Sequence, residues 1–421
     1  MSKQTPHDRT DSFAENYAEY KRYLCQNVQP SRPPFDTADG MRVTNVEGRE
    51  FLDFASQTLN LNLGQCHPDI VEVVERQANR LQYTSSRYLD EPTMRLAKRI
   101  AEVAPEGLDK VNPKVTGGSI ANEGAIKMAR KKHDGNTIAT TYGSFFGETN
   151  EVMRLSGKYY DKDFLVTDGD FEHFDPPYAG DSVSESADEF RKLAETREDL
   201  CGVILTPIDV NAGVVEFPKS YLQDVRNICD EHDIALIFDE VQTGFGWLGQ
   251  MFAAEYYDVT PDIMTLAKGI SAGYPLGAIV CREEYDVVGY GEHEFTHGAN
   301  PIASAVAVTN IDILTQPGYL DEVADKGELL GERLAGLEDE FDIVDDVRRF
   351  GLIAGVDIVD DGEPSPELAE EIFEACLDEG IMFRLSGDFG GNSLVIKPPV
   401  IAKRSQIDTA IDTLRDVLER H

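Results

Sequence analysis

The sequence lacks the features that would place a protein in a membrane or outside the cell. It has no uninterrupted apolar run of about 18 residues, so it predicts no transmembrane helix. Its start, MSKQTPHDRTDSF, is polar, which predicts no secretion signal. Its six cysteines do not have the paired spacing of a disulfide framework: Cys25, Cys66, Cys201, Cys229, Cys281 and Cys376. We therefore expect reduced thiols and a cytoplasmic location.

Positive charge is also scarce. The chain of 421 residues has 39 lysines and arginines against 77 acidic residues, a net charge of −38. Such a charge repels phosphate, which disfavours nucleic acid and anionic membranes as partners. The acidic residues recur throughout the chain. Because molar salt screens charge over about 3 Å, this composition indicates adaptation to a salt-rich cytoplasm, as in halophiles, with an ordinary acidic protein as the alternative.

Short apolar runs alternate with segments of helical periodicity in the middle of the chain. This alternation is typical of an α/β domain with a mostly parallel sheet. From residue 312, acidic amphipathic helices alternate with short strands, which predicts a smaller α+β domain. We expect an N-terminal segment over 1–60, in which an irregular arm leads to a turn-rich pair in MRVTNVEGREFLDFA (41–55), a large domain over 61–311 and the small domain over 312–421. The predicted strands are 200–208, 234–240, 262–267, 277–283, 352–359 and 392–397, and a helix is predicted over 219–233.

Two charged residues stand at the ends of apolar strands. The run IALIFDE ends in Asp239 and Glu240, and DIMTLAKG places Lys268 after the next predicted strand. An unpaired charge at the end of a buried strand is costly, so both residues are expected to face one cleft. The alternatives are that Asp239 only caps a turn and that Lys268 is a solvated loop charge.

A third segment completes a recognisable set of groups. In VTGGSIANEGAIKMARKK, two glycines and Ser119 precede a predicted helix, whose free N–H groups would bind an anion. An amine, a carboxylate and an anion site are what pyridoxal phosphate requires. The turn YGSFFGE offers Phe145 or Phe146 to stack on its ring.

These motifs resemble a known family. The stretch from IFDEVQTGFGW to TLAKGISAGYPLGAIV is similar to the signature of the class III aminotransferases, which are fold type I pyridoxal-phosphate enzymes, and the similarity extends from LNLGQCHPDI to KPPV. The resemblance implies a large domain with a mostly parallel seven-stranded sheet flanked by helices. It also implies a homodimer, or a tetramer made of two such dimers, in which Thr296 reaches the partner subunit's cofactor. The other implied cofactor residues are Lys268 as the Schiff-base lysine, Asp239 at the pyridinium nitrogen, Gln242 near the ring hydroxyl, Gly118 and Ser119 at the phosphate, and Phe145 on the ring.

Three positions depart from the family pattern. Thr206 stands where relatives usually carry a glutamate, and Glu148 stands where many 2-oxoglutarate-using relatives carry an arginine. Val395 stands where a C-terminal arginine is usual. Exchanging arginine for glutamate replaces attraction for a carboxylate with repulsion. We therefore expect that the pocket does not bind a dicarboxylate in the usual pose.

Other residues near these positions offer a substitute grip for a substrate: Arg384, Lys397 or Arg87. The phosphate loop also differs, since Gly117 and Ile120 replace the serine and glutamate common in relatives. The expected reaction is transamination between an amine or amino acid and a keto acid or aldehyde. Racemisation or epimerisation, an amino shift and decarboxylation remain alternatives, because the same cofactor supports them.

A hydrolase is the alternative from a different class of enzyme. HEFTH at 293–297 matches the zinc-protease pattern, which requires both histidines on one face of a helix. Turn residues crowd both ends of this segment, which disfavours a helix there. A non-catalytic relative that only binds the cofactor is disfavoured because Lys268 and Asp239 are both present. No metal site is expected.

Overall fold

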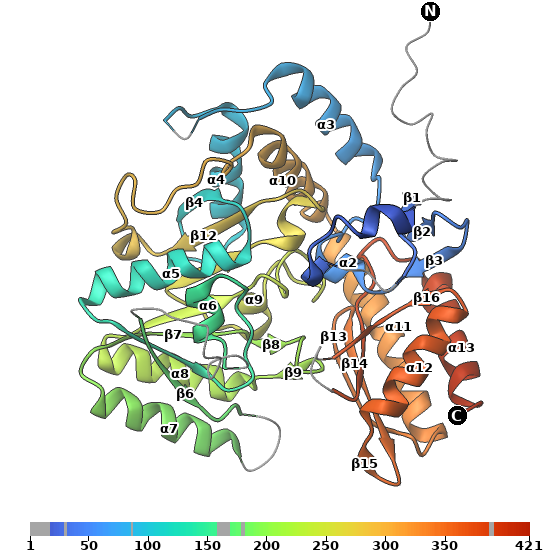
Figure 1. The fold of residues 1–421 in the computed structure, drawn as a ribbon. Coiled ribbons are helices and arrows are strands. Elements are labelled where there is room, and N and C mark those ends of the chain that lie inside the picture. The colour runs from blue at the N-terminus through green and yellow to red at the C-terminus, as the bar shows by residue number, and fades with distance from the viewer. Residues whose placement is uncertain (1–16, 29–31, 86, 158–168, 178–181, 387–390) are drawn as a thin grey trace, which may run out of the picture.

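A seven-stranded sheet forms the centre of the larger part of the molecule (Figure 1). The computed structural model describes residues 17–28, 32–85, 87–157, 169–177, 182–386 and 391–421, so the polar start at 1–13 lies outside it. The sheet order is β4-β12-β11-β10-β7-β5-β6, and only β12 runs antiparallel to its neighbours. The strands are β4 (Lys110–Val115), β5 (Thr137–Thr141), β6 (Asp170–Phe174), β7 (Leu200–Leu205), β10 (Ala235–Asp239), β11 (Ile263–Leu266) and β12 (Gly277–Cys281). The expected α/β fold with a mostly parallel seven-stranded sheet is confirmed.

Helices cover both faces of this sheet because its central strands are apolar on both sides. In β10, Ala235 and Ile237 belong to the buried cluster that includes α5, whereas Leu236 and Phe238 belong to the cluster that includes α8. The helices of this part are α3 (Pro68–Arg80), α4 (Glu91–Val103), α5 (Gly118–His133), α6 (Asn150–Leu155), α7 (Ser182–Thr196), α8 (Lys219–His232), α9 (Ala253–Tyr257) and α10 (Pro301–Leu314). Short elements are η3 (Lys268–Ser271), η4 (Glu283–Tyr285), β8 (Ile208–Asp209) and β9 (Val215–Glu216).

The C-terminal part is a second, antiparallel sheet covered by helices, as the change of pattern near residue 312 predicts. Its strand order is β13-β14-β18-β17, with β15 paired to β14. The strands are β13 (Val344–Phe350), β14 (Ile353–Asp360), β15 (Glu363–Pro364), β17 (Arg384–Leu385) and β18 (Ser393–Ile396). The helices are α11 (Tyr319–Glu340), α12 (Pro366–Asp378) and α13 (Arg404–Leu418). This α+β region is confirmed, while domain boundaries at 60 and 311 stay predictions.

The turn-rich stretch 41–55 contains two antiparallel paired strands, and the arm before it contains more regular structure than expected. Where an irregular arm was predicted, β1 (Phe35–Asp39) pairs antiparallel with β2 (Arg42–Asn45), because Gly40 closes a tight turn with φ of 55°. β3 (Glu50–Asp53) then pairs in parallel with β16 (Ile381–Met382). This pairing joins the N-terminal segment to the C-terminal region. The segment also contains η2 (Gln26–Val28) and a turn, α2 (Ser56–Leu59).

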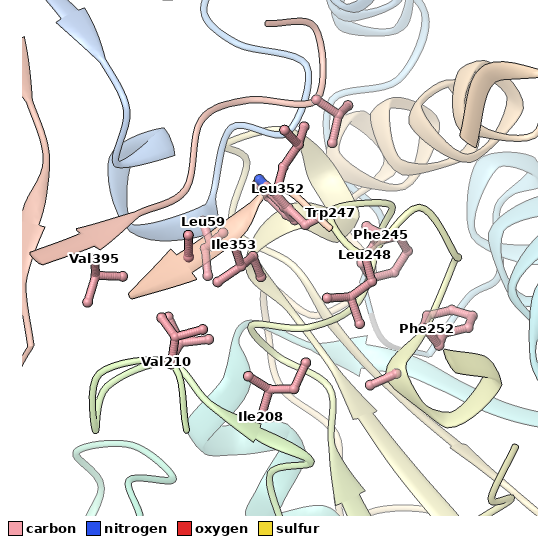
Figure 2. Packing of buried hydrophobic residues seen from close by; sticks show 14 of the residues in the cluster. Leu59, Ile208, Val210, Phe245, Trp247, Leu248, Phe252, Leu352, Ile353 and Val395 are labelled. Atoms are coloured by element: carbon pink, nitrogen blue, oxygen red, sulfur yellow. The ribbon is translucent and has the colours of Figure 1, made fainter. Parts of the chain in front are cut away.

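Buried side chains join the two main parts of the molecule without a break. Figure 2 shows Phe245, Trp247 and Leu248 of the large part packed near Leu352 and Ile353 of the C-terminal part. Trp247 is fully buried and donates from Nε1 to the Pro398 carbonyl oxygen over 2.9 Å. The core therefore holds the C-terminal sheet against the region that carries Lys268.

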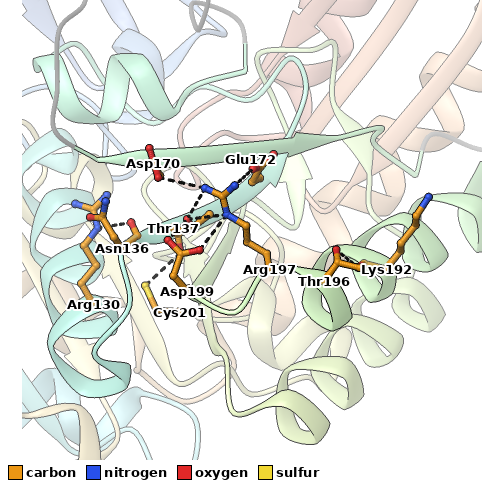
Figure 3. Close-up of polar contacts among 10 residues, drawn as sticks. All are labelled: Arg130, Asn136, Thr137, Asp170, Glu172, Lys192, Thr196, Arg197, Asp199 and Cys201. Atoms are coloured by element: carbon orange, nitrogen blue, oxygen red, sulfur yellow. Dashed lines mark hydrogen bonds and ion pairs between the residues drawn. The ribbon is translucent and has the colours of Figure 1, made fainter.

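An ion-pair cluster occupies the amino ends of three strands, at the sheet edge opposite the carboxyl ends of β10 and β11. Figure 3 shows Arg197 between the first residues of β5 and β6. Its guanidinium contacts Asp199 at 3.0 Å, Asp170 at 3.2 Å and Glu172 at 3.0 Å, and donates to Thr137 Oγ1. These contacts tie β5, β6 and β7 together. The charged residues predicted for chemistry lie at the other edge.

Two findings bear on the predictions about transmembrane helices and disulfides. Among the helices that the structure describes, none has the length and apolar character needed to cross a bilayer. All six cysteines are free thiols, with Cys25 and Cys66 exposed and the other four buried.

Candidate active site

Lys268 follows β11 after one residue, Ala267, and begins a strained loop. Its φ of 48° is in the left-handed region, which is uncommon outside glycine. The buried Asn310 of α10 donates to the carbonyl oxygens of Gly269 at 2.7 Å and Ile270 at 3.1 Å. Asn310 in turn accepts a hydrogen bond from Asn62 Nδ2 at 3.0 Å. These fully buried contacts hold the loop in a conformation that its sequence alone does not favour.

Asp239 ends β10, one strand away from Lys268. The Asn122 amide donates to one carboxylate oxygen at 2.9 Å, and the Val241 N–H donates to the other at 2.8 Å. The Val241 contact is the turn cap considered above, so Asp239 closes the turn as well as facing the site. Thr265 Oγ1 donates to Asn122 Oδ1 at 2.6 Å, which fixes the direction in which the amide points.

Burial shifts the pKa of both groups. Burial raises the pKa of Asp239. The hydrogen bonds from Val241 and Asn122 and the charge of Lys268 partly oppose this increase. Burial is the main cause that lowers the pKa of Lys268 to about 8; the charge of Asp239 opposes this change and the charge of Arg384 contributes to it. An amine with this pKa is partly neutral near neutral pH, as a nucleophile or a base requires.

The start of α5 forms a cradle for an anion. Gly117 at the N-cap makes no side-chain capping bond, so the first N–H groups of this helix have no side-chain cap. A Cβ atom on Gly118 would meet Val241 at 2.9 Å, and one on Gly147 would meet Ser119 Oγ at 2.1 Å. Ser119 Oγ accepts from the Glu148 N–H at 3.2 Å. Gly118 and Gly147 therefore let Val241 and Ser119 pack closely against the backbone, while the space beside Gly117 is open, since nothing lies within 4 Å of its Cβ position.

A cavity of about 430 Å³ brings these groups together. Lys268, Asp239 and the α5 start all line it, as do the half-buried Phe145 and Thr206, the exposed Glu148 and the buried Gln242. In the described part of the chain, Gln242 Oε1 is buried with no hydrogen-bond partner, so it can accept from a ligand hydroxyl. The amine, carboxylate, anion cradle, aromatic ring and unpaired acceptor together fit pyridoxal phosphate. Further lining residues are Asn60, Thr116, Asn122, Phe146, Gly147, Val241, Ala267, Gly273, Tyr274, Pro275 and Leu276.

Several predicted residues lie outside this cavity. Thr296 is exposed, and its carbonyl oxygen accepts from the Tyr83 hydroxyl at 3.0 Å. Arg87 is also exposed and does not line the cavity. Arg384 lines a second cavity of about 800 Å³ together with Thr58. Val395 and Lys397 are buried, each with 1% of its surface exposed.

The HEFTH segment does not form the helix that the zinc pattern requires. His293 is buried, with Nε2 at 2.9 Å from the Ile120 carbonyl oxygen, whereas His297 is exposed in a turn beside Tyr83. Over the described residues, no three histidine, cysteine, aspartate or glutamate side chains gather as a metal site would require. His293 serves to pack the start of α5 instead.

Sequence reasoning missed three polar residues of the site: Asn122, Thr265 and Asn310. Asn122 follows Ser119 by one helical turn, so helical spacing places both on the same side of α5. That spacing could have suggested Asn122 from the sequence. Asn310 lies in an apolar helix far along the chain, and only the tertiary structure brings it to the lysine loop.

Comparison with known proteins identifies the family. The model of the family Aminotransferase class-III matches residues 25–418. An acetylornithine aminotransferase of Caldanaerobacter subterraneus subsp. tengcongensis is 35% identical over 94% of this chain and 98% of its own length. An acetylornithine aminotransferase of Methanocaldococcus jannaschii is 33% identical over 90% and 91% of the two chains.

Solved structures agree with this match. A transaminase from the marine bacterium Virgibacillus superposes with a TM-score of 0.90 at 27% identity, covering 97% of this chain and 98% of that one. The taurine:2-oxoglutarate aminotransferase of Bifidobacterium kashiwanohense, solved with PLP and glutamate, gives a TM-score of 0.87 at 25% identity and covers 100% and 99%. The chain therefore belongs to the class III aminotransferases, and its cofactor is pyridoxal 5′-phosphate.

Proposed function

We propose that this transaminase works through Lys268 and Asp239 and takes an amino acid or amine that is not held by the usual dicarboxylate grips. The observation that carries the proposal is the convergence of Lys268, Asp239 and the α5 start on one cavity. In this assignment Lys268 bonds the cofactor, and Gly118 and Ser119 hold its phosphate. Phe145 stacks on its ring.

Each residue of the site would then have a distinct role in the reaction. Bound pyridoxal phosphate supplies a conjugated ring that accepts the electron pair left when a bond at the substrate carbon breaks. The Lys268 amine would take the proton from that carbon and pass it to the cofactor rather than back to the substrate carbon, as transamination requires. The Asp239 carboxylate holds the proton on the ring nitrogen, with Asn122 fixing its orientation. Gln242 Oε1 accepts from the ring hydroxyl.

The substrate assignment rests on the cavity lining. Glu148 and Thr206 line the cavity where arginine and glutamate are usual, and Val395 is buried and apolar. A carboxylate at Glu148 would be repelled, so we expect glutamate to be a poor donor. The curated relatives named above are acetylornithine aminotransferases, which supports an amino acid whose far end carries no second carboxylate.

Two measurements test this function. The purified protein should be yellow, its absorbance band should shift with borohydride, and Lys268→Ala should abolish the band. Mixing the holoenzyme with a panel of amines, diamines and amino acids should discharge the band, and product analysis would separate transamination from racemisation or epimerisation, an amino shift and decarboxylation. A colourless protein whose activity depends on a chelatable metal would refute the proposal.

Glu148 provides a sharper test of the substrate assignment. Replacing it by arginine should raise kcat/KM for glutamate by about tenfold or more, because repulsion becomes a charged hydrogen bond. Glu148→Gln should give a smaller increase. If glutamate is already the best donor of the wild-type enzyme, the assignment is wrong.

We also propose a homodimer with shared active sites. Large apolar side chains lie exposed around the Thr296 turn and α4, among them Tyr83, Tyr88, Leu89 and Met94. Burying them against a second copy would bring Thr296 to the phosphate of the partner subunit's cofactor. Sedimentation should give a dimer or a larger assembly, and Thr296→Ala should weaken cofactor retention. A fully active monomer would contradict this.

A further inference from the structure

The Thr296 loop, residues 293–298, lies against β4. Lys114 of β4 contacts it twice: its Nζ is 3.4 Å from the Glu294 carboxylate, and its carbonyl oxygen would lie 2.1 Å from a Cβ atom on Gly298. Glycine allows this close approach of the two backbones because it has no Cβ. Since β4 leads directly into the anion cradle at the start of α5, these contacts fix the loop to one side of that cradle.

His293 fixes the same loop to the other side of the cradle. Its imidazole is buried, and Nε2 lies 2.9 Å from the carbonyl oxygen of Ile120 in the first turn of α5. A carbonyl oxygen only accepts, so Nε2 carries the proton and donates. Nδ1 can then accept from Lys127 Nζ at 3.3 Å. Burial and the charge of Lys127 lower the pKa of His293, which keeps the ring neutral near pH 7.

Gly124 in α5 makes room for this imidazole. A Cβ atom on Gly124 would lie 2.5 Å from His293 Nε2 and 2.3 Å from Ile279 Cδ1. Glycine is unfavourable inside a helix, where it has more conformational freedom to lose than alanine. At this position it lets the ring reach the Ile120 carbonyl oxygen, which an alanine side chain would prevent.

The loop and the cradle therefore form one connected unit with two ends. At one end, Ser119 and the first N–H groups of α5 line the cavity that contains Lys268. At the other end, Thr296 is exposed, three residues after His293. In the homodimer proposed above, the cradle serves the cofactor of its own subunit and Thr296 serves that of the partner subunit. A displacement of the first turn of α5 would reach Thr296 through His293.

We propose that His293 is a positioning residue that ties together the two cofactor sites of the dimer. Its hydrogen bond to Ile120 holds the cradle of its own subunit and, through the same loop, the Thr296 hydroxyl that completes the phosphate site of the partner subunit. The inference rests on the proposed function, including the homodimer, and goes beyond it by assigning this role to His293.

Cofactor binding to the apoenzyme tests the role of His293 within one subunit. The cofactor band gives dissociation constants for pyridoxal phosphate and for pyridoxal, which lacks the phosphate. His293→Leu should weaken binding of pyridoxal phosphate by about tenfold and that of pyridoxal by less than about threefold, because the lost hydrogen bond acts at the phosphate end. His293→Gln, whose amide can donate in place of Nε2, should recover part of the loss. Gly124→Ala displaces the ring and should give the same selective loss if the leucine variant folds poorly.

Lys131→Gln is the matched control. Lys131 lies in the last turn of α5 and pairs with the Glu292 carboxylate, just before the Thr296 loop. This contact joins the same two segments at the far end of the helix from the cradle. Its loss should therefore leave both dissociation constants unchanged.

Mixed dimers test the link between the two sites. One subunit carries Lys268→Ala, so only the other subunit forms the cofactor band. When the Lys268→Ala subunit also carries His293→Leu, the reporting site keeps its own cradle but receives Thr296 from an altered loop. Its affinity for pyridoxal phosphate should fall by about threefold or more, as it should with Thr296→Ala in place of His293→Leu.

Three results would overturn the inference alone: unchanged affinity for pyridoxal phosphate in His293→Leu, equal losses for pyridoxal phosphate and pyridoxal, or an unaltered reporting site in the mixed dimer with His293→Leu. A wild-type enzyme that forms no cofactor band, or one that is a fully active monomer, would overturn the proposed function as well.

Discussion

Asp239 and Glu240 are adjacent buried carboxylates with different surroundings. Asp239 faces the cavity, whereas Glu240 accepts from the N–H groups of Ala253 at 3.0 Å and Ala254 at 2.7 Å at the start of α9. Burial raises the pKa of Glu240 to about 7. At the scale of single residues, Asp239 is therefore available for chemistry, whereas Glu240 stabilises the fold by capping the start of α9.

We expect Asp239→Asn and Glu240→Gln to separate these roles. Asp239→Asn should lower kcat/KM by about 100-fold or more, because the ring nitrogen loses its anionic partner, and should leave Tm nearly unchanged. The pKa of Lys268 should fall below about 8, because Asp239 raises it. Rates over pH 6–10 and thermal melts of both variants provide the measurement.

Glu240→Gln should instead lower Tm while kcat/KM changes by less than about threefold, since glutamine has one acceptor oxygen in place of two and leaves the N–H of Ala253 or Ala254 without its partner. The pKa of Glu240 is about 7 in the folded protein and about 4.5 in the unfolded chain. Protonated Glu240 therefore stabilises the folded state; this contribution is complete below about pH 4.5 and is lost as the pH rises through 7. The Tm of the wild type should therefore fall more steeply over this range than that of Glu240→Gln. A large activity loss in Glu240→Gln with unchanged Tm would contradict this division.

At the scale of elements, apolar runs predicted the strands well but not the direction of β12 or the strained turns. β10, β11 and β12 match the predicted strands to within two residues at each end. The antiparallel direction of β12 follows from its short connection over 267–276, which contains only η3 and cannot make a parallel crossover. The left-handed turn at Ser56–Leu59 contains no glycine from which it could have been predicted. Contacts from Asp53 and Lys397 stabilise it.

The lysine loop depends in the same way on α10. Asn310→Ala would leave the carbonyl oxygens of Gly269 and Ile270 without this donor, at a cost of about 1–3 kcal/mol per group, and would remove one of the acceptors of the Asn62 amide, which also donates to the Phe245 carbonyl oxygen at 3.3 Å. We expect a lower Tm, a kcat reduced by about tenfold or more because Lys268 is displaced, and a KM little changed. Asn310→Asp, which keeps one acceptor but loses both donor contacts, should resemble Asn310→Ala.

Thr309→Ala is the control for this prediction. Thr309 is adjacent on α10, and its hydroxyl donates within the helix, to the Ala305 carbonyl oxygen at 3.0 Å. Its replacement should leave kcat unchanged. Full activity in Asn310→Ala after correction for the folded fraction would show that Asn310 supports the fold alone.

At the scale of the whole molecule, the excess of acidic side chains opposes compaction. The fold still contains many surface ion pairs, among them Arg191–Glu231 at 2.6 Å and Arg415–Glu340 at 2.6 Å. Exposed pairs contribute little each, about 0–1 kcal/mol, and salt weakens them. With 77 acidic against 39 basic residues, we expect repulsion among unmatched carboxylates to outweigh what these pairs lose to screening.

Stability should therefore rise with salt. Raising KCl from 0.1 to 2 M shortens the screening length from about 10 Å to below about 3 Å, so we expect Tm to rise by about 5 °C or more. The exposed cluster Glu338, Asp339 and Asp342 allows a matched test. The triple variant Glu338→Gln, Asp339→Asn and Asp342→Asn should have a higher Tm than the wild type at 0.1 M KCl. At 2 M KCl the two proteins should have the same Tm. A Tm that is flat or falls with salt in both proteins would show that ion pairs dominate and that the acidic composition is not an adaptation to salt.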